Sequence, residues 1–438
     1  MALLIRHATL VTVNTDNEVI DDGFLLIEGA HLTAIGPMSA LDSGACQAVE
    51  IIDAAGYVVT PGLINAHTHA AMVLMRGYFD DQPLMPWLQK GIWPLEARMF
   101  ERGLAEDAVY AGTRLAIAEM LLGGTTCFND MYHSFGAAAR AIVETGIRAI
   151  PSGVVLGIFP DALSRFERTV TECRDWQGAG DGRLTVKLAP HAVYSCDPPL
   201  LRRVRAAAEQ LSVGLHTHLS ETPWEVQEIE SRHGKSPVAL LDDLGLFDLP
   251  MIAAHCVHVT DADLEILCRK NVAVAHNPTS NLKLASGIAP VARFLREGLT
   301  VGVGTDGAAS NNNLDQLEEV RLAALLAKGS RLDATAVDAV TALRMATIEG
   351  ARALGLDATI GSLEVGKLAD VVLWDFQRPH LTPRHNVVSN LIYAAQASDA
   401  DTVIVNGEVL VQHRQLTRLD LAEVASEANR LAFLLTQP

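Results

Sequence analysis

Residues 58–67, VVTPGLINAH, form a short apolar run that ends in a histidine, and seven similar runs follow along the chain. The seven are GTTCFNDM (124–131), RAIPSGVV (148–155), LTVKLAPHAVY (184–194), VGLHTHLS (213–220), MIAAHC (251–256), VAVAHNP (272–278) and VGVGTDG (301–307). Amphipathic stretches with helical spacing, such as 105–124 and 197–211, lie between them. Buried strands that alternate with helices are typical of a parallel sheet. Eight such units predict an α/β protein with a closed (β/α)8 barrel of the TIM type, whose functional groups lie at the carboxyl ends of the strands.

The two ends of the chain have a different pattern. Residues 3–14, 23–36 and 48–60 alternate β-branched and polar residues between Gly, Asp and Asn turns, and residues 363–415 return to this pattern. Such segments are typical of small antiparallel strands. We therefore expect residues 1–58 and 363–415 to form one small β-sandwich and residues 59–362 to form the barrel. The helical spacing near the end predicts a C-terminal helix within 416–438.

Composition limits the classes of partner. The chain of 438 residues carries 34 Lys and Arg against 52 Asp and Glu, a net charge of -18, so we expect no nucleic-acid partner. The first residues do not resemble a signal peptide and no run of 18 apolar residues occurs, so we expect no membrane contact and a cytoplasmic location. The six cysteines, Cys46, Cys127, Cys173, Cys196, Cys256 and Cys268, have no C-x-x-C spacing. This pattern predicts free thiols in a reducing compartment.

Histidines and one aspartate collect where the predicted strands end. His67-Thr68-His69 ends the first strand and His216-Thr217-His218 the fifth, while His255, His276 and Asp306 end the sixth, seventh and eighth. Residues i and i+2 of an extended segment face the same side, so two imidazoles can converge on one ion. Core histidines are not expected to gather at one rim of a barrel. Three histidines and a carboxylate with room for water predict a Zn²⁺ or Fe²⁺ site.

The strings PGLINAHTH, THLSE, AAHCVH, HNPTSNLKL and GTDGAASNNN resemble the amidohydrolase superfamily, and within it the 5'-methylthioadenosine/S-adenosylhomocysteine deaminases. The resemblance covers nearly the whole chain. It implies that His67, His69, His218 and Asp306 hold one catalytic metal per subunit, usually zinc, with Fe²⁺ as the other candidate.

The resemblance also implies the reaction, hydrolytic deamination of an adenine ring. Glu221 matches the family's proton-shuttling glutamate, and His255 matches the histidine that orients the attacking hydroxide. Such a reaction needs a nucleophile at C6 and protons at N1 and at the leaving nitrogen, which Glu221 and Asp306 can supply together. The H-x-E and P-C-x-x-C motifs of another class of zinc deaminases are absent.

Substrate contacts are implied by the same resemblance. Glu96 matches a residue that accepts ribose hydroxyls, His191 a substrate-binding histidine, and Arg148 a residue that meets the carboxylate of S-adenosylhomocysteine; Glu221 also contacts the substrate. Each of the first three has an alternative: Glu96 as a polar residue of a lid, His191 as a buried imidazole, and Arg148 as a surface cation. Arg165 is a weaker candidate for a second cation.

Several other residues have two interpretations. Ser310 and Asn311 could bond ring nitrogens or shape a turn. Trp87 and Trp93 could line a slot for a thioether or pack in the core. We expect residues 70–104, which contain both tryptophans, to form a lid.

Two residues bear on the number of metal ions. Lys187 lies four residues before His191, and His191 rather than Lys187 stands at the end of the predicted strand. This placement favours a structural lysine and a mononuclear site. His276 is expected behind the site, in a segment that shapes the loop.

The leading interpretation is a deaminase of S-adenosylhomocysteine and 5'-methylthioadenosine, with adenosine as a further substrate, in a homo-oligomeric protein. A related amidohydrolase acting on guanine, an oxidised purine or a triazine is the nearest alternative. Glu96 and Arg148 favour a nucleoside, since a bare heterocycle has neither ribose nor carboxylate. A non-catalytic barrel that serves as a scaffold is the alternative of another class.

Overall fold

A computed structural model describes residues 2–41 and 50–437. Its centre is a sheet of eight strands that pair in chain order, each parallel to the next. The strands are β6 (Leu63–Thr68), β7 (Thr125–Tyr132), β8 (Arg148–Val155), β9 (Lys187–Pro190), β10 (Gly214–Leu219), β11 (Met251–His255), β12 (Ala273–His276) and β13 (Val301–Val303). Just past β13, the backbone N–H of Asp306 donates to the carbonyl of His67 at 3.0 Å, which brings the two ends of the sheet together. The predicted barrel is confirmed.

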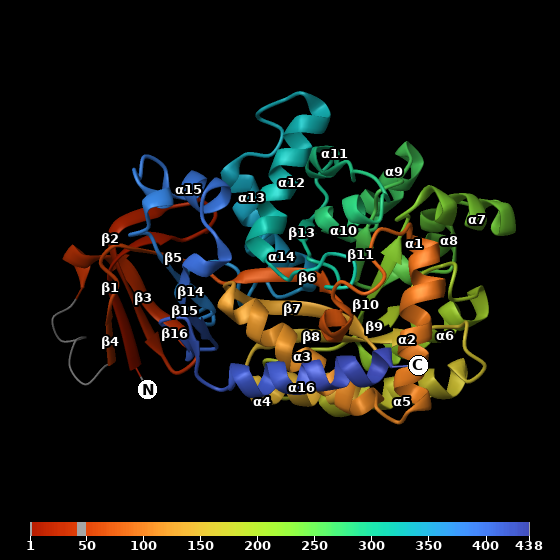
Figure 1. The fold of residues 1–438 in the computed structure, drawn as a ribbon. Coiled ribbons are helices and arrows are strands. Elements are labelled where there is room, and N and C mark those ends of the chain that lie inside the picture. The colour runs from red at the N-terminus through yellow and green to blue at the C-terminus, as the bar shows by residue number, and fades with distance from the viewer. Residues whose placement is uncertain (1, 42–49, 438) are drawn as a thin grey trace.

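Helices cover the outside of the barrel (Figure 1). They are α3 (Ala105–Leu122), α4 (Phe135–Thr145), α5 (Ala162–Trp176), α6 (Pro198–Leu211), α7 (Pro223–His233), α8 (Pro237–Asp243), α9 (Asp261–Arg269), α10 (Pro278–Lys283), α11 (Val291–Arg296), α12 (Gln316–Arg331), α13 (Ala339–Met345) and α14 (Ile348–Leu354). A further helix, α15 (Val387–Tyr393), contacts α12 and α13. Every residue of β6 and β7 is buried. Strands that are covered on both faces are apolar along nearly their whole length, and the sequence pattern therefore predicted the positions of these strands.

The ends of the chain form a second, mixed sheet. Its strands are β1 (Ala2–Val11), β2 (Val19–Glu28), β3 (His31–Pro37), β4 (Glu50–Asp53), β5 (Tyr57–Pro61), β14 (Val371–Asp375), β15 (Ala400–Val405), β16 (Glu408–Gln412) and β17 (Gln415–Leu416). These strands form one connected sheet. Along one side of β1, residues 3–6 pair with β4 and residues 9–10 pair with β5. In the pairing of β1 with β2, the register shifts around His7, whose φ is +59°. A bulge of this kind bends a strand.

The segment after the first barrel strand is helical rather than an open loop. It contains η3 (Ala70–Met75), α1 (Leu84–Pro86), η4 (Trp87–Ile92) and α2 (Trp93–Glu101). The C-terminal helix α16 (Leu421–Thr436) runs beside α3 and α2 (Figure 1) and buries Leu431 and Leu435 there. The C-terminal helix therefore supports the segment that covers the barrel mouth.

Among the described helices, none is long and apolar enough to cross a membrane. The cysteines Cys127, Cys173, Cys196, Cys256 and Cys268 are free thiols, as expected. Cys46 lies outside the described residues.

Candidate metal centre and active site

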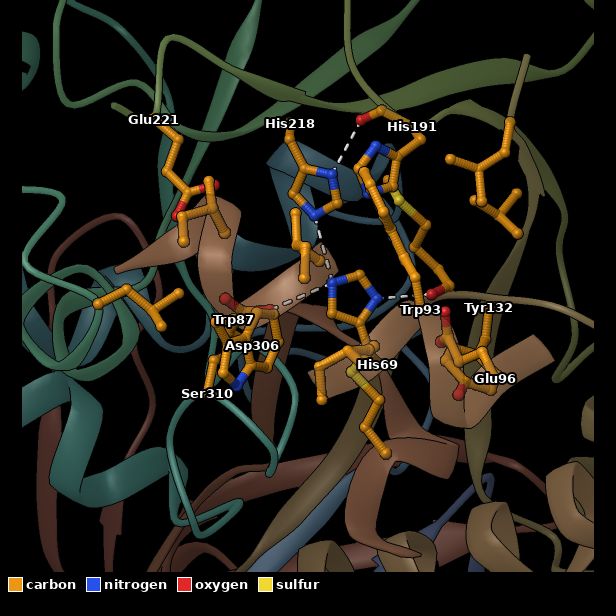
Figure 2. Close-up of a pocket in the computed structure, with 18 of the residues that line it drawn as sticks. His69, Trp87, Trp93, Glu96, Tyr132, His191, His218, Glu221, Asp306 and Ser310 are labelled. Atoms are coloured by element: carbon orange, nitrogen blue, oxygen red, sulfur yellow. Dashed lines mark hydrogen bonds and ion pairs between the residues drawn. The ribbon is translucent and has the colours of Figure 1, made fainter. Parts of the chain in front are cut away.

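Three histidines and one aspartate converge at the carboxyl end of the barrel. Figure 2 shows His69, His218 and Asp306 of this cluster. Oδ1 of Asp306 lies 3.3 Å from Nε2 of His67 and 3.2 Å from Nε2 of His69. Nε2 of His69 lies 3.2 Å from Nε2 of His218. These contacts join the ends of β6 and β10 to the loop after β13. The structure thus brings together the four residues expected to hold the metal.

The backbone around Asp306 is shaped by its neighbours in GTDG. Asp306 has a φ of +59°, a conformation that few residues other than glycine adopt. At Gly304 an added Cβ would lie 2.7 Å from the backbone of His67, so only glycine allows this approach. The Asp306 carboxylate accepts a hydrogen bond from Ser280 Oγ at 2.6 Å and from the N–H of Gly307 at 2.8 Å. The local sequence therefore fixes both its position and its orientation.

The cluster fits a cation. Nε2 of His67 is buried and has no hydrogen-bond partner. A tetrahedral ion with ligand bonds of about 2.0–2.1 Å keeps its ligand atoms about 3.3 Å apart, close to the spacings found here. Burial opposes a charge on His69, yet contact with the Asp306 carboxylate raises the pKa of this histidine to about 9. The carboxylate thus draws a positive charge into a buried site.

Glu221 and His255 stand beside the cluster. Oε2 of Glu221 lies 3.7 Å from Nε2 of His255, which lies 3.9 Å from Oδ2 of Asp306. Ser286 donates to the other oxygen of Glu221 at 3.0 Å. Nδ1 of His255 donates to Oδ1 of Asn281 at 2.8 Å, with Nε2 facing the two carboxylates. Glu221 and His255, the two groups expected to take part in the reaction, are therefore held beside the His/Asp cluster.

The environments of the two carboxyl groups push their pKa values apart. Burial raises the pKa of Glu221 above its usual range. Burial acts in the same direction on Asp306, but its contacts with His67 and His69 hold the pKa well below the usual range. Two titratable groups with opposite shifts are suited to separate roles as proton donor and proton acceptor.

A pocket of about 590 Å³, including its mouth, opens onto this centre. Glu221 lies on one side and Glu96 on the other in Figure 2. The pocket walls also include His191, Ser310, Trp87 and Trp93, together with Met72, Leu84, Leu88, Ile92, Met131, Tyr132, His133, Val154, Leu156, Tyr194 and Leu284. The segment 70–104 therefore supplies a large part of the pocket wall.

Glu96 has two polar neighbours that no sequence motif singled out. Nε2 of His133 lies 3.8 Å from Oε2 of Glu96. Burial and, to a smaller extent, the charge of Glu96 hold the pKa of the Tyr132 phenol well above its usual range. The Tyr132 hydroxyl is buried without a hydrogen-bond partner. Tyr132 is the last residue of the buried strand β7, and His133 follows it directly. Their position at the end of an apolar run is the sequence feature that could have identified them as pocket residues.

His191 lines the pocket as a neutral ring. Burial lowers its pKa to about 3, and its Nδ1 lies 2.9 Å from Ser195 Oγ. Its carbonyl accepts a hydrogen bond from Nδ1 of His218 at 2.8 Å. Ser310 also reaches the pocket, whereas Asn311 donates to Glu319 and to the carbonyl of Thr305 and shapes the loop.

The structure corrects the expectation for Arg148. This residue begins β8, at the end of the barrel remote from the metal ligands, and its side chain is buried. Its Nε and Nη2 donate to the carboxylate of Asp370 at 2.7 and 3.1 Å, and Nη2 donates to Asn406 at 3.1 Å. These contacts join the barrel to the second sheet. Arg148 does not line the pocket and is a structural residue.

Arg165 faces a second cavity that adjoins the first. The two cavities share Tyr132, His133, Val154 and Leu156 as wall residues. Arg165 stacks on Phe100 and Phe159, at 4.5 and 4.7 Å from their ring centroids, and pairs with Asp161 at 2.8 Å. Arg168 and two carboxylates, Glu106 and Glu172, also line this cavity. A cation paired with Asp161 thus lies beside the pocket, at a residue that was only a weaker candidate from its local sequence.

Two other residues lie away from the cluster. Lys187 is the first residue of β9 and its Nζ donates to the carbonyl of Leu354 at 3.5 Å. Burial lowers its pKa to about 8. His276 is buried, does not line the pocket, and has a pKa lowered to about 3 by burial. Both positions are compatible with the expected site for a single ion.

The family of the chain follows from this centre together with comparison to known proteins. The amidohydrolase family matches residues 58–410, which span the barrel and its metal ligands. The chain belongs to the amidohydrolase family. It is 48% identical over 428 residues to a 5-methylthioadenosine/S-adenosylhomocysteine deaminase of Moorella thermoacetica, with 98% of each chain covered.

Solved structures of other amidohydrolases share the fold over nearly the whole chain. An adenosine deaminase from Xanthomonas campestris with bound zinc matches with a TM-score of 0.93 and 38% identity, covering 99% of this chain and 98% of the other. The zinc complex of the atrazine chlorohydrolase TrzN from Arthrobacter aurescens TC1 matches with a TM-score of 0.90 and 27% identity, covering 98% and 100%. This amidohydrolase is therefore a hydrolase, and its barrel carries a cluster of histidines and an aspartate that could hold a metal ion.

Proposed function

We propose that this amidohydrolase removes ammonia hydrolytically from the adenine ring of S-adenosylhomocysteine and 5'-methylthioadenosine, and also of adenosine. The observation that carries the proposal is the presence of the His/Asp cluster with Glu221 on one side of a pocket and Glu96 on the other side. The relatives at 48% identity, which are named for this activity, support it.

His67, His69, His218 and Asp306 would hold the metal, for which we propose one zinc ion per subunit. When bound, such an ion makes a water molecule acidic enough to serve as a nucleophile near neutral pH. The remaining steps are performed by side chains of this chain. Asp306, which stays a carboxylate, accepts the proton that the attacking water loses.

Glu221 supplies the first proton to the ring. Its raised pKa favours the protonated form, which donates to N1 as the water oxygen bonds to C6. A second proton, passed from Asp306, then reaches the exocyclic nitrogen, the C6–N bond breaks, and ammonia leaves. His255, held by Asn281, orients the oxygen that attacks C6. As the C6–N bond breaks, the proton of the C6 hydroxyl returns to Glu221 and the C6=O bond forms, so Glu221 and Asp306 regain their starting forms. Water and the adenine ring thus give the inosyl ring and ammonia.

The nucleoside assignment rests on Glu96 and its neighbours. A carboxylate can accept hydrogen bonds from both hydroxyls of a ribose, and a bare purine or triazine offers neither. The Tyr132 hydroxyl and His133 lie beside this carboxylate and can complete the hydrogen bonding of the sugar. His191 presents a neutral ring to the base or sugar.

The substituent at the 5' position of the nucleoside is proposed to bind in the second cavity, which adjoins the pocket. Arg165 and Arg168 can meet the carboxylate of S-adenosylhomocysteine, in place of Arg148. Glu106 and Glu172 line the same cavity and can attract the ammonium group of the amino acid. We further propose a cytoplasmic homo-oligomer whose ligands are small nucleosides rather than nucleic acids or membranes.

A substrate panel tests the function. The purified zinc-loaded protein is incubated with S-adenosylhomocysteine, 5'-methylthioadenosine, adenosine, 2',3'-dideoxyadenosine, guanine and a triazine, and ammonia release is measured. The expected result is turnover of the three ribonucleosides and a loss of kcat/KM of about 10- to 150-fold when both hydroxyls are missing, as for a charged hydrogen bond of about 1.5–3 kcal/mol. Turnover of guanine or a triazine alone would instead favour that branch of the family.

A further inference from the structure

His216 is the buried partner of a metal ligand. It belongs to the same H-x-H motif as His218, but it lies two residues further from the strand end and is fully buried. Its Nε2 lies 2.8 Å from Nδ1 of His67, so one of the two rings donates to the other. The direction of this bond decides whether Nε2 of His67 can bind a metal.

The direction can be traced from a backbone carbonyl. Nδ2 of Asn129 lies 2.9 Å from the carbonyl oxygen of Ala66, and a carbonyl can only accept, so the NH₂ group of Asn129 must face it. The amide oxygen then faces Oγ of Ser152 at 3.1 Å. An amide oxygen also only accepts, so the single hydroxyl proton of Ser152 points to Asn129.

The rest of the chain of hydrogen bonds follows. Ser152 has given its proton to Asn129, so Oγ accepts from Nδ1 of His216 at 3.3 Å. Nδ2 of Asn129 lies 3.2 Å from Nδ1 and 3.4 Å from Nε2 of His216, and it can only donate, so with the ring proton on Nδ1 its second proton is accepted by Nε2. A ring with its one proton on Nδ1 has a lone pair on Nε2. His216 therefore accepts from Nδ1 of His67, and Nε2 of His67 is left without a proton.

We propose that His216 is a positioning residue that fixes the tautomer and orientation of His67 as a metal ligand. The hydrogen-bonded circuit begins at the carbonyl of Ala66, passes through Asn129, Ser152 and His216, and returns to the adjacent residue, His67. Partners of this kind usually are carboxylates or carbonyls, and their loss weakens metal binding by about 10- to 100-fold. Here a second imidazole has this role.

The inference rests on the metal site of the proposed function but not on its substrate. It is tested by zinc affinity, measured on the full-length metal-free protein by competition with a chelating dye. Two amide variants are the matched pair, because they offer hydrogen-bonding groups at different places. His216→Gln can place its oxygen where Nε2 was and accept from His67, whereas His216→Asn reaches only the position of Nδ1, beside Ser152.

The expected result is an ordered series. His216→Gln keeps the zinc affinity within about fivefold of the parent chain, while His216→Asn and His216→Ala weaken it by about 10- to 100-fold. A purely packing role would affect Gln and Asn variants alike, and equal zinc affinities of these two variants would overturn the proposal. The thermal midpoint of each metal-free variant shows whether it folds.

Ser152→Ala gives an independent result if the His216 variants do not fold. It removes the acceptor of His216 Nδ1 but only a small volume, so zinc affinity should fall by several-fold while the midpoint of the metal-free chain changes little. Unchanged affinity would contradict the circuit. A parent chain that binds zinc but deaminates no nucleoside would overturn the proposed function and leave this inference intact.

Discussion

Nε2 of His69 faces Nε2 of His218 at 3.2 Å, while the opposite nitrogen of each ring donates to a backbone carbonyl. Nδ1 of His69 lies 2.6 Å from the carbonyl of Met131, and Nδ1 of His218 lies 2.8 Å from that of His191. Both facing nitrogens therefore carry lone pairs when the rings are neutral. A cation between them, either a proton or a metal ion, removes the repulsion.

Competition between proton and metal gives the first prediction. The pKa of His69 in the metal-free site is about 9, so the proton must leave before zinc binds at neutral pH. Apparent zinc affinity should fall about tenfold for each pH unit lowered from 9 to 7, as one proton is displaced. His69→Ala should bind zinc weakly and lack turnover. Equal zinc affinity at pH 7 and pH 9 would contradict this competition.

Glu221→Gln separates proton transfer from binding. The amide keeps the size of the side chain and can still contact Ser286, but it cannot donate an acidic proton. We expect unchanged zinc content and a fall in kcat of about 10²- to 10⁴-fold, the usual contribution of general acid–base catalysis. Metal analysis and steady-state kinetics on 5'-methylthioadenosine provide the test, and turnover at the parent rate would remove Glu221 from the mechanism.

Arg148→Met is expected to act on stability rather than on substrate choice. It leaves the buried carboxylate of Asp370 without its ion pair, and breaking such a pair by removing one partner typically costs about 3–5 kcal/mol. Denaturant unfolding should show this loss. The values of kcat/KM for S-adenosylhomocysteine and 5'-methylthioadenosine should change by the same factor in the folded variant. A loss confined to S-adenosylhomocysteine would restore Arg148 as a substrate contact.

Arg165→Gln should show the selectivity that Arg148 lacks. A hydrogen bond to a charged group contributes about 1.5–3 kcal/mol, and the partial exposure of Arg165 screens it, so we expect about a tenfold loss for S-adenosylhomocysteine. 5'-Methylthioadenosine carries no carboxylate and should be turned over at nearly the parent rate. Kinetics on the two substrates measure the difference, and equal losses would place the carboxylate elsewhere.

Lys187 gives a prediction for stability against pH. Burial lowers its pKa from 10.5 to about 8, so the folded chain binds fewer protons than the unfolded chain between these values. The free energy of unfolding contributed by this group should therefore rise as pH increases from 8 to 10.5. Lys187→Met should be more stable than the parent at pH 7, with the gain shrinking above pH 8. Denaturant unfolding at pH 7 and pH 9.5 checks both the sign and the trend.

The sequence by itself determined the barrel and the gathering of histidines and an aspartate at its strand ends, because both depend on short-range patterns, whereas the choice of metal ligands among them came from the resemblance to the amidohydrolase superfamily. Strands buried on both faces must be apolar throughout, and an H-x-H pair at a strand end directs two rings to one side. The positions of His67, His69, His218 and Asp306 at strand ends were therefore enough to place all four at one rim of the barrel.

Only the tertiary structure decided what the remaining side chains contact. Arg148 meets Asp370, 222 positions later in the chain, and no local pattern reveals such a pair. Arg165 gains its place from the aromatic rings of Phe100 and Phe159, and His216 gains its role from Asn129 on β7 and Ser152 on β8. Backbone periodicity sets which way a residue faces, but the partner that satisfies a buried charge or hydrogen bond is set by packing between segments that are distant in sequence.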